Sequence, residues 1–378
     1  KKKKKQASAK KQKGVFSRDF FLKLNCAYFY FSAFFSQTFS LPDEYGESGR
    51  LNCRTDNENN LRCFPEFWFI GASKCATTTM AHQMYEDPEL VPLGGPHENR
   101  LIDDLYHKKV HSLIDLEQKL KPEIYYEANN ETIPHVFYYR PDNLYYPYAP
   151  KRIYNTLGDS FAKHVKFLVM LREPVSRTFS SWSFKHAGKG EHRSFEIALR
   201  MEINQFKAWY LCIRRNISKG IQEAREKYCD PKKFVKGNTK MHHLSKSVYY
   251  YQLLHWFSYF PPANFHVIFM EDFIADERRL YNQAMEFFGL HEIEAKLEEE
   301  AVGKLFSMVK NRTKKKKSEA PSKHLQGDLD IFFSKHNRDL AKLLGIKYSF
   351  ESGSCHSTKV SSSLSLQSNA TWICKSTS

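Results

Sequence analysis

The stretch IGASKCATTTM, from Ile70 to Met80, follows an apolar run that begins at Phe67 and opens a segment with a helical pattern. A short strand, a tight glycine loop with one lysine, and hydroxyl side chains at the start of a helix usually bind a phosphate group. The spacing of the nucleoside-triphosphate P-loop is missing, because that motif places its lysine directly before Ser or Thr. Here two residues separate Lys74 from Thr77. We therefore expect an anion-binding loop of another kind.

A second informative stretch is FLVMLREPVSRTFSSWSF, from Phe167 to Phe184. It reads as a buried strand that ends at Arg172, followed by a helix that begins at Pro174, a favoured place for proline. Arg177 and Ser180 lie on the first turns of this helix. An arginine at a strand end and a serine eight residues later can meet on one phosphate, and the guanidinium supplies charge-assisted hydrogen bonds.

Short apolar runs alternate with helical patterns along most of the chain. Strands are predicted at 67–70, 124–127, 167–171 and 266–270, and helices at 78–85, 175–185, 195–213, 248–260, 277–288 and 329–344. Alternation of this kind predicts an α/β fold, with a central parallel sheet that carries helices on both faces. Ligands of such sheets bind beyond the carboxyl ends of the strands, where Gly71, Arg172 and Glu271 fall.

The chain divides into four parts by composition. Residues 1–19 form a basic flexible leader, residues 20–65 an irregular segment with cysteines, residues 66–350 one domain, and residues 351–378 a Ser-rich tail predicted to be disordered. The aromatic segment Phe20–Phe39 follows basic residues, as a membrane anchor would, but Lys23 interrupts it. A buried or amphipathic helix is favoured there over a membrane span, and an anchor further upstream stays open.

The net charge of +16 is concentrated in two places, because eight lysines lie within residues 1–13 and four more at Lys314–Lys317. The rest of the chain is only mildly basic, and without zinc-finger spacing or an RNA-binding aromatic motif we expect no nucleic-acid partner. No C-x-x-C occurs, which argues against a zinc site. The close pairs Cys53/Cys63 and Cys212/Cys229 are disulfide candidates in an oxidising compartment. Four N-x-[ST] sequons hint weakly at a glycoprotein.

Taken together, G-x-x-K-x-x-T-T (Gly71–Thr78) and L-R-x-P-x-x-R-x-x-S (Leu171–Ser180) resemble the sulfotransferase superfamily. Three further segments are similar to those of Golgi carbohydrate sulfotransferases: YYEANNETIPHVFYYRP at 125–141, VIFMEDF at 267–273 and FFSKHNRDLAKLLG at 332–345. The resemblance covers about residues 66–350, which implies a single sulfotransferase domain with a P-loop-like sheet. The spacing and the pair Cys212/Cys229 look most like the N-acetylgalactosamine 4-sulfate 6-O-sulfotransferases of the chondroitin-modifying branch.

This resemblance implies that the loop binds the 5′-phosphosulfate of 3′-phosphoadenosine 5′-phosphosulfate. Lys74 would neutralise the oxygen between phosphate and sulfate as that bond breaks. Arg172 and Ser180 would bind the 3′-phosphate, and no metal is required. The expected donor-binding residues are Gly71, Lys74, Cys75, Ala76, Thr77, Thr78, Thr79, Arg172, Ser180, Arg312 and Lys314.

The family supplies a glutamate after the first helix as general base, usually in K-E-x-H. In PLGGPHENRLIDD, residues 92–104, Pro96 and His97 match the family's P-H, and two glycines stand where K-E should be. The candidate bases are therefore Glu98 and, after it, His97. Ala76 is a second departure, because the family mostly has glycine there. Cys75 resembles a nucleophile only superficially, since no His–Asn set accompanies it.

Two charged groups have open roles. Arg312 and Lys314 belong to a charge run that is either solvated or, as the resemblance implies, placed near the 3′-phosphate or a sulfated acceptor. Glu271 and Asp272 end a strand, where capping of the next helix competes with catalysis.

The resemblance thus implies a lumenal Golgi enzyme, of type II membrane topology, that sulfates a glycosaminoglycan. The predicted acceptor is N-acetylgalactosamine in chondroitin or dermatan, at the 6-hydroxyl. Two alternatives remain: an inactive relative that binds a sulfated glycan, and a nucleotide kinase with a variant loop.

Overall fold

The computed structural model describes residues 53–55, 61–93, 95–99, 125–126, 135–188, 190–234, 242–307, 322–349, 354–358 and 371–375. The basic leader, the segment Phe20–Phe39 and the residues Arg312 and Lys314 lie outside these ranges. The expectations for them stay predictions.

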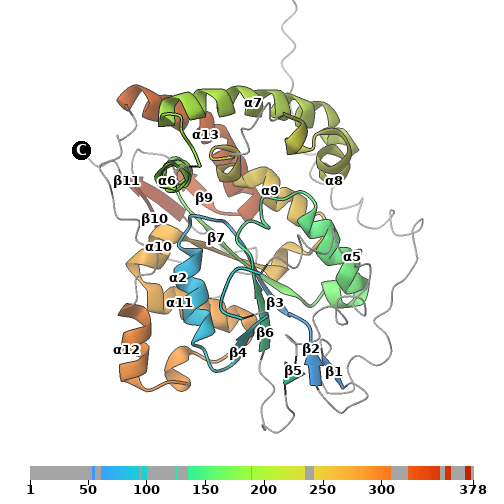
Figure 1. Ribbon diagram of the computed structural model, residues 1–378, viewed down its shortest axis with the longest axis vertical. Helices are drawn as coiled ribbons and strands as arrows, with labels where there is room; N and C mark the ends of the chain where they lie inside the picture. The colour runs from blue at the N-terminus through green and yellow to red at the C-terminus, as the bar shows by residue number, and fades with distance from the viewer. Residues whose placement is uncertain are drawn as a thin grey trace, which may run out of the picture. The chain divides into compact units, whose positions relative to one another are not determined.

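The core of the described chain is a five-stranded parallel sheet with helices around it (Figure 1). Its strands run in the order β4 (Leu90–Pro92), β6 (His135–Tyr139), β3 (Phe67–Gly71), β7 (Lys166–Leu171) and β8 (Phe265–Phe269). Every residue of β3 is buried. Strands buried on both faces lack polar alternation, which explains the continuous apolar runs and confirms the predicted α/β fold.

One predicted strand belongs to a different sheet. The run at 124–127 forms only β5 (Tyr125–Tyr126), which pairs antiparallel with β2 (Leu61–Cys63), and β2 pairs with β1 (Cys53–Thr55). The prediction that it joins the central sheet is therefore wrong. β6 takes that place, between β4 and β3, and the aromatic run HVFYY was the signal that the sequence offered.

The predicted helices occur. The long helices are α2 (Thr77–Tyr85), α5 (Ala149–Ala162), α6 (Pro174–Ala187), α7 (Phe195–Asn216), α9 (Tyr249–Trp256), α11 (Glu277–Phe288), α12 (Glu299–Ser307) and α13 (Lys323–Leu344), and the short ones are α8 (Ile221–Glu223) and α10 (Met270–Ala275). Among the long helices, all the predicted ones but α11 have shifted ends, and α5 and α12 were not predicted. α13 begins before residue 329 because the Ser322 hydroxyl accepts a hydrogen bond from the Leu325 amide and so caps its start. Among the described residues, no helix is both long and apolar enough to cross a membrane.

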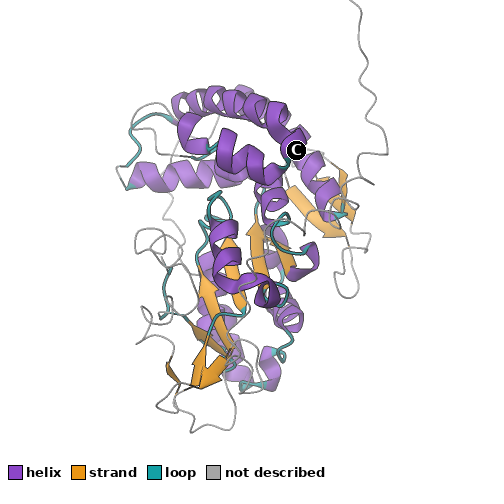
Figure 2. Cartoon of the chain, turned by 90° about the vertical axis from the view of Figure 1, so that its right-hand side faces the viewer, coloured by secondary structure: helices purple, strands orange, loops and turns teal. Residues whose placement is uncertain are grey.

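A second apolar cluster fixes α6, the helix of the arginine–serine motif. Val175 and Trp182 of α6 pack with residues of α7 and α13, apart from the core around the sheet. Figure 2 shows these helices gathered beyond one end of the central strands. The cluster holds α6 at the sheet edge where the ligand is expected.

Both cysteine pairs form disulfides, as predicted. Cys53–Cys63 joins β1 and β2, and Cys212–Cys229 joins α7 to the residue after the helical segment Ala224–Tyr228. Within the tail, β10 (Ser354–Thr358) and β11 (Thr371–Lys375) form a three-stranded sheet with β9 (Lys347–Ser349). The division of the chain into four parts stays a prediction.

Candidate functional site

The loop between β3 and α2 has an unusual backbone. Lys74 and Ala76 adopt left-handed conformations, with φ of 72° and 59°. Alanine is less stable than glycine in this conformation, so alanine in place of the family's usual glycine strains the loop at Ala76. At Gly71, a Cβ atom would lie 2.6 Å from Leu144 Cβ and 2.9 Å from the carbonyl oxygen of Pro141. Glycine is therefore needed because the neighbouring chain passes close to the loop.

The start of α2 is suited to an anion. No side chain caps this helix, and its first turn contains no acidic residue. The first amide groups of a helix have no partner within the helix and carry the positive end of its dipole. Of the three threonines in this turn, Thr77 and Thr79 are buried and Thr78 is partly exposed. The Tyr139 hydroxyl donates to the Thr77 hydroxyl, at 3.2 Å, and so holds the turn against β6.

Arg177 joins the second motif to the loop. Its guanidinium is fully buried and donates to the carbonyl oxygen of Ser73 at 3.0 Å, to the Ser73 hydroxyl at 3.1 Å and to the carbonyl oxygen of His243 at 2.9 Å. These donors hold the loop in place and leave this side chain little room to contact a ligand. The sequence pattern contained Arg177 but gave no indication of this supporting role.

Lys74 and Arg172 place positive charge at the loop. Arg172 Nη1 lies 3.4 Å from the Lys74 carbonyl oxygen, and the Tyr249 hydroxyl donates to the Arg172 carbonyl oxygen at 3.0 Å. Burial lowers the pKa of Lys74, and the charges of Arg177 and Arg172 lower it further. Because an anion relieves the repulsion among neighbouring cations, the positive charge at this loop favours an anionic ligand.

Cys75, a residue of the loop itself, is fully buried. Its Sγ lies 3.7 Å from the Tyr249 hydroxyl, and burial raises the pKa of the thiol to about 11. A thiol with so high a pKa is not a nucleophile near neutral pH, which agrees with the sequence interpretation.

Of the two candidate bases, Glu98 is the one whose side chain is held by a hydrogen bond to another side chain. Arg140 Nη1 donates to Glu98 Oε2 at 3.0 Å, and the Glu98 side chain remains 47% exposed. The negative charge of Glu98 also acts on Lys74, where it partly offsets the lowering of the pKa by burial and by the two arginines. His97 is exposed, and its amide donates to the Gly95 carbonyl oxygen. Sequence reasoning missed Arg140, which directly follows the unrecognised strand β6.

The acidic pair after β8 has a structural contact. Glu271 Oε1 accepts a hydrogen bond from the Glu173 amide at 3.0 Å, and Glu173 in turn caps α6 by accepting from the amides of Val175 and Ser176. Glu271 lies in the first turn of α10 and does not have the capping role expected from the sequence; it positions the start of α6 instead, which is a structural role. Ser180 lies farther along α6, partly buried.

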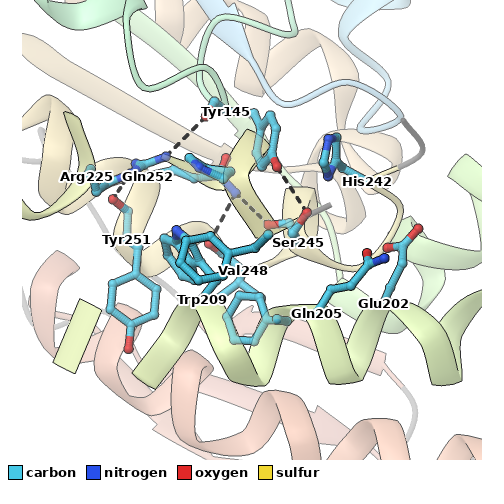
Figure 3. A pocket seen from close by; sticks show the side chains of 13 residues that line it. Tyr145, Glu202, Gln205, Trp209, Arg225, His242, Ser245, Val248, Tyr251 and Gln252 are labelled. Atoms are coloured by element: carbon cyan, nitrogen blue, oxygen red, sulfur yellow. Dashed lines mark hydrogen bonds between the residues drawn. The ribbon is translucent and has the colours of Figure 1, made fainter. Parts of the chain in front are cut away.

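A cavity lies behind the segment that carries the His243 carbonyl. Figure 3 shows Tyr145 bonded to Ser245, and the guanidinium of Arg225 bonded to the carbonyl oxygens of Tyr145 and Tyr251. Glu202 lines the same cavity and accepts hydrogen bonds from the amides of His243 and Leu244. The two hydrogen bonds from Glu202 hold the segment at His243 and Leu244, whose His243 carbonyl oxygen accepts the hydrogen bond from Arg177. Within the described ranges, no group of three metal-ligating side chains lies close enough to hold an ion.

Comparison with known proteins identifies the family. The family described as "Sulfotransferase domain" matches residues 96–338, which is more than half of the chain and begins after the loop at 71–79. Among solved structures, a sulfotransferase from Alicyclobacillus acidocaldarius shares 18% identity, covering 75% of this chain and 96% of its own, with a TM-score of 0.48. A sulfotransferase domain from the curacin biosynthetic pathway shares 12% identity, covering 61% and 75%, with a TM-score of 0.32. No curated protein sequence matches. On the domain match, the chain belongs to the sulfotransferase domain family.

Proposed function

We propose that this sulfotransferase moves a sulfuryl group from 3′-phosphoadenosine 5′-phosphosulfate to a sugar hydroxyl of a glycosaminoglycan. The observation that carries the donor assignment is the uncapped start of α2, with Lys74 and Arg172 beside it. Free amide groups at a helix start, with cationic side chains nearby, favour a ligand that carries linked anionic groups.

The donor residues divide by which end of the nucleotide they bind. The amides of the loop, the Thr78 hydroxyl and Lys74 bind the 5′-phosphosulfate. Arg172 and Ser180, from the end of β7 and from α6, bind the 3′-phosphate. Arg312 and Lys314 are proposed to complete the 3′-phosphate side. Lys74 stabilises the negative charge that gathers on the bridging oxygen when the sulfur–oxygen bond breaks.

Glu98 is the proposed general base. The acceptor hydroxyl oxygen attacks sulfur, its proton passes to the Glu98 carboxylate, and the bond from sulfur to the bridging oxygen breaks to leave the 3′,5′-bisphosphate. Arg140 holds the carboxylate by one oxygen and leaves the exposed side of the group for the acceptor. A base must reach the hydroxyl before its pKa matters, and the contact with Arg140 supplies that orientation.

The acceptor and the compartment follow from the resemblance to the chondroitin-modifying branch. We place the chain in the Golgi lumen as a type II membrane protein, acting on N-acetylgalactosamine of chondroitin or dermatan at the 6-hydroxyl. Two disulfides, Cys53–Cys63 and Cys212–Cys229, support an oxidising compartment. A glycosaminoglycan partner and a membrane anchor are parts of this proposal.

A second candidate is an inactive relative that still binds sulfated glycan. The strained Ala76 and the missing K-E pair favour it. A nucleotide kinase is disfavoured, because Lys74 lacks the P-loop spacing.

A transfer assay separates these functions. Purified protein is incubated with the donor and with chondroitin 4-sulfate, dermatan sulfate, heparan sulfate or keratan sulfate, and the disaccharides are analysed by mass spectrometry. The proposal expects 6-O-sulfation of N-acetylgalactosamine 4-sulfate, and none with Lys74→Met. Donor binding without transfer to any acceptor would establish the inactive relative instead. Transfer to heparan or keratan alone would keep the reaction and reject the acceptor.

A further inference from the structure

Lys74 lies on an exposed aromatic ring. Its Nζ is 3.8 Å from the centroid of the Phe184 ring, and Phe184 is 50% exposed. Phe184 belongs to α6, one turn after Ser180. The ring that contacts the lysine therefore comes from the helix that carries Ser180, one of the proposed 3′-phosphate residues.

The Phe184 ring is in direct contact with the Lys74 ammonium group. Arg172 and Arg177 repel the ammonium group, and Glu98 attracts it without forming an ion pair in the described part of the chain. A cation over an aromatic face is attracted by the ring quadrupole, but more weakly than by a hydrogen-bonded anion. An anion in the loop would thus draw Lys74 off the ring.

We propose that Phe184 is a positioning residue, which holds the Lys74 ammonium in the donor-free protein and releases it when the donor binds. The inference rests on the proposed role of Lys74. Once the lysine is released, the exposed apolar ring face is available to the acceptor.

The first test measures binding of the 3′,5′-bisphosphate product by calorimetry, with no transfer required. In Phe184→Leu the side chain stays apolar but the aromatic face is lost, so Lys74 is no longer held on the ring. We expect product binding to tighten by about 2- to 5-fold. The acceptor KM should rise while kcat stays within about 2-fold. Unchanged product affinity and unchanged KM would overturn the inference.

The second test follows the ring itself. Phe184→Trp places a fluorescent ring under Lys74, and its emission is read as the difference from the wild-type protein, which has tryptophans of its own. At bisphosphate concentrations that saturate each variant, the bisphosphate should change this emission, the change should vanish with Lys74→Met, and it should persist with Lys185→Met. Lys185 is the matched control because its Nζ lies 5.8 Å from the same ring. A change that survives Lys74→Met would overturn the inference.

These outcomes separate the inference from the proposed function. A protein that binds the bisphosphate but shows no effect of Phe184 keeps its donor site and loses the positioning role. A protein that does not bind the bisphosphate loses both.

Discussion

The guanidinium of Arg177 binds Ser73 twice, at the carbonyl oxygen and at the hydroxyl, 104 positions earlier in the chain. The helix of the second motif thereby supports the loop of the first motif. Two segments that look like separate anion-binding signals in the sequence form one unit in the fold.

Arg177→Met should test this unit. The substitution removes a buried charged donor and leaves the Ser73 and His243 carbonyl oxygens without it. We expect the free energy of unfolding, measured in urea, to fall by about 2–4 kcal/mol, and the bisphosphate to bind more weakly. Arg214→Met, on the exposed side of α7, is the control and should change stability by less than about 0.5 kcal/mol. Equal effects of the two variants would contradict the supporting role.

Arg172→Ala should separate the two ends of the nucleotide. If Arg172 binds the 3′-phosphate, the bisphosphate should lose about 1.5–3 kcal/mol of binding free energy, the range for a charged hydrogen bond. Adenosine 5′-phosphate, which lacks the 3′-phosphate, should bind almost as before. Calorimetry with both nucleotides checks this, and the exposed Arg279→Ala serves as control. Equal losses for the two nucleotides would mean that Arg172 acts only on the loop, through the Lys74 carbonyl.

Glu98→Gln should abolish proton transfer while keeping the size of the side chain. We expect turnover to fall roughly 10²- to 10⁴-fold, the usual contribution of a general base, with the affinity for the bisphosphate unchanged. Glu86→Gln, at the exposed end of α2, is the matched control. If Glu98→Gln stays active and His97→Ala is inactive, the base is His97. If both stay active, neither residue is the base.

Glu202 should give stability a characteristic pH dependence. Burial raises the pKa of this carboxyl from 4.5 to about 7. Between these values the folded protein binds more protons than the unfolded chain, so the contribution of Glu202 to stability is present below pH 4.5 and is lost as the pH rises through 7. The free energy of unfolding of the wild type minus that of Glu202→Gln should therefore fall by about 1–3 kcal/mol between pH 5 and 8.

Urea unfolding at several pH values checks this dependence. Glu300→Gln, an exposed position on α12, should give a difference that does not change with pH. A Glu202 difference that stays flat, or rises with pH, would show that the carboxyl is ionised in the folded protein.

The sequence by itself determined the features that depend on near neighbours. The apolar runs gave β3, β7 and β8, helical periodicity gave α11 with its observed ends, and short cysteine spacing gave both disulfides. The loop and the arginine–serine motif were recognisable because their residues lie within one strand–helix turn. Local dihedral preferences and side-chain periodicity act over a few residues, so a pattern in the sequence reports them directly.

Only the tertiary structure decided how these parts meet. Whether β5 or β6 joins the central sheet depends on strand order, which no local pattern encodes. The contacts Arg177–Ser73, Arg140–Glu98 and Lys74–Phe184 each join residues far apart in the chain. Each forms because the carboxyl ends of parallel strands lie at one edge of the sheet, where the packing of α6 against α7 and α13 brings its side chains to the loop.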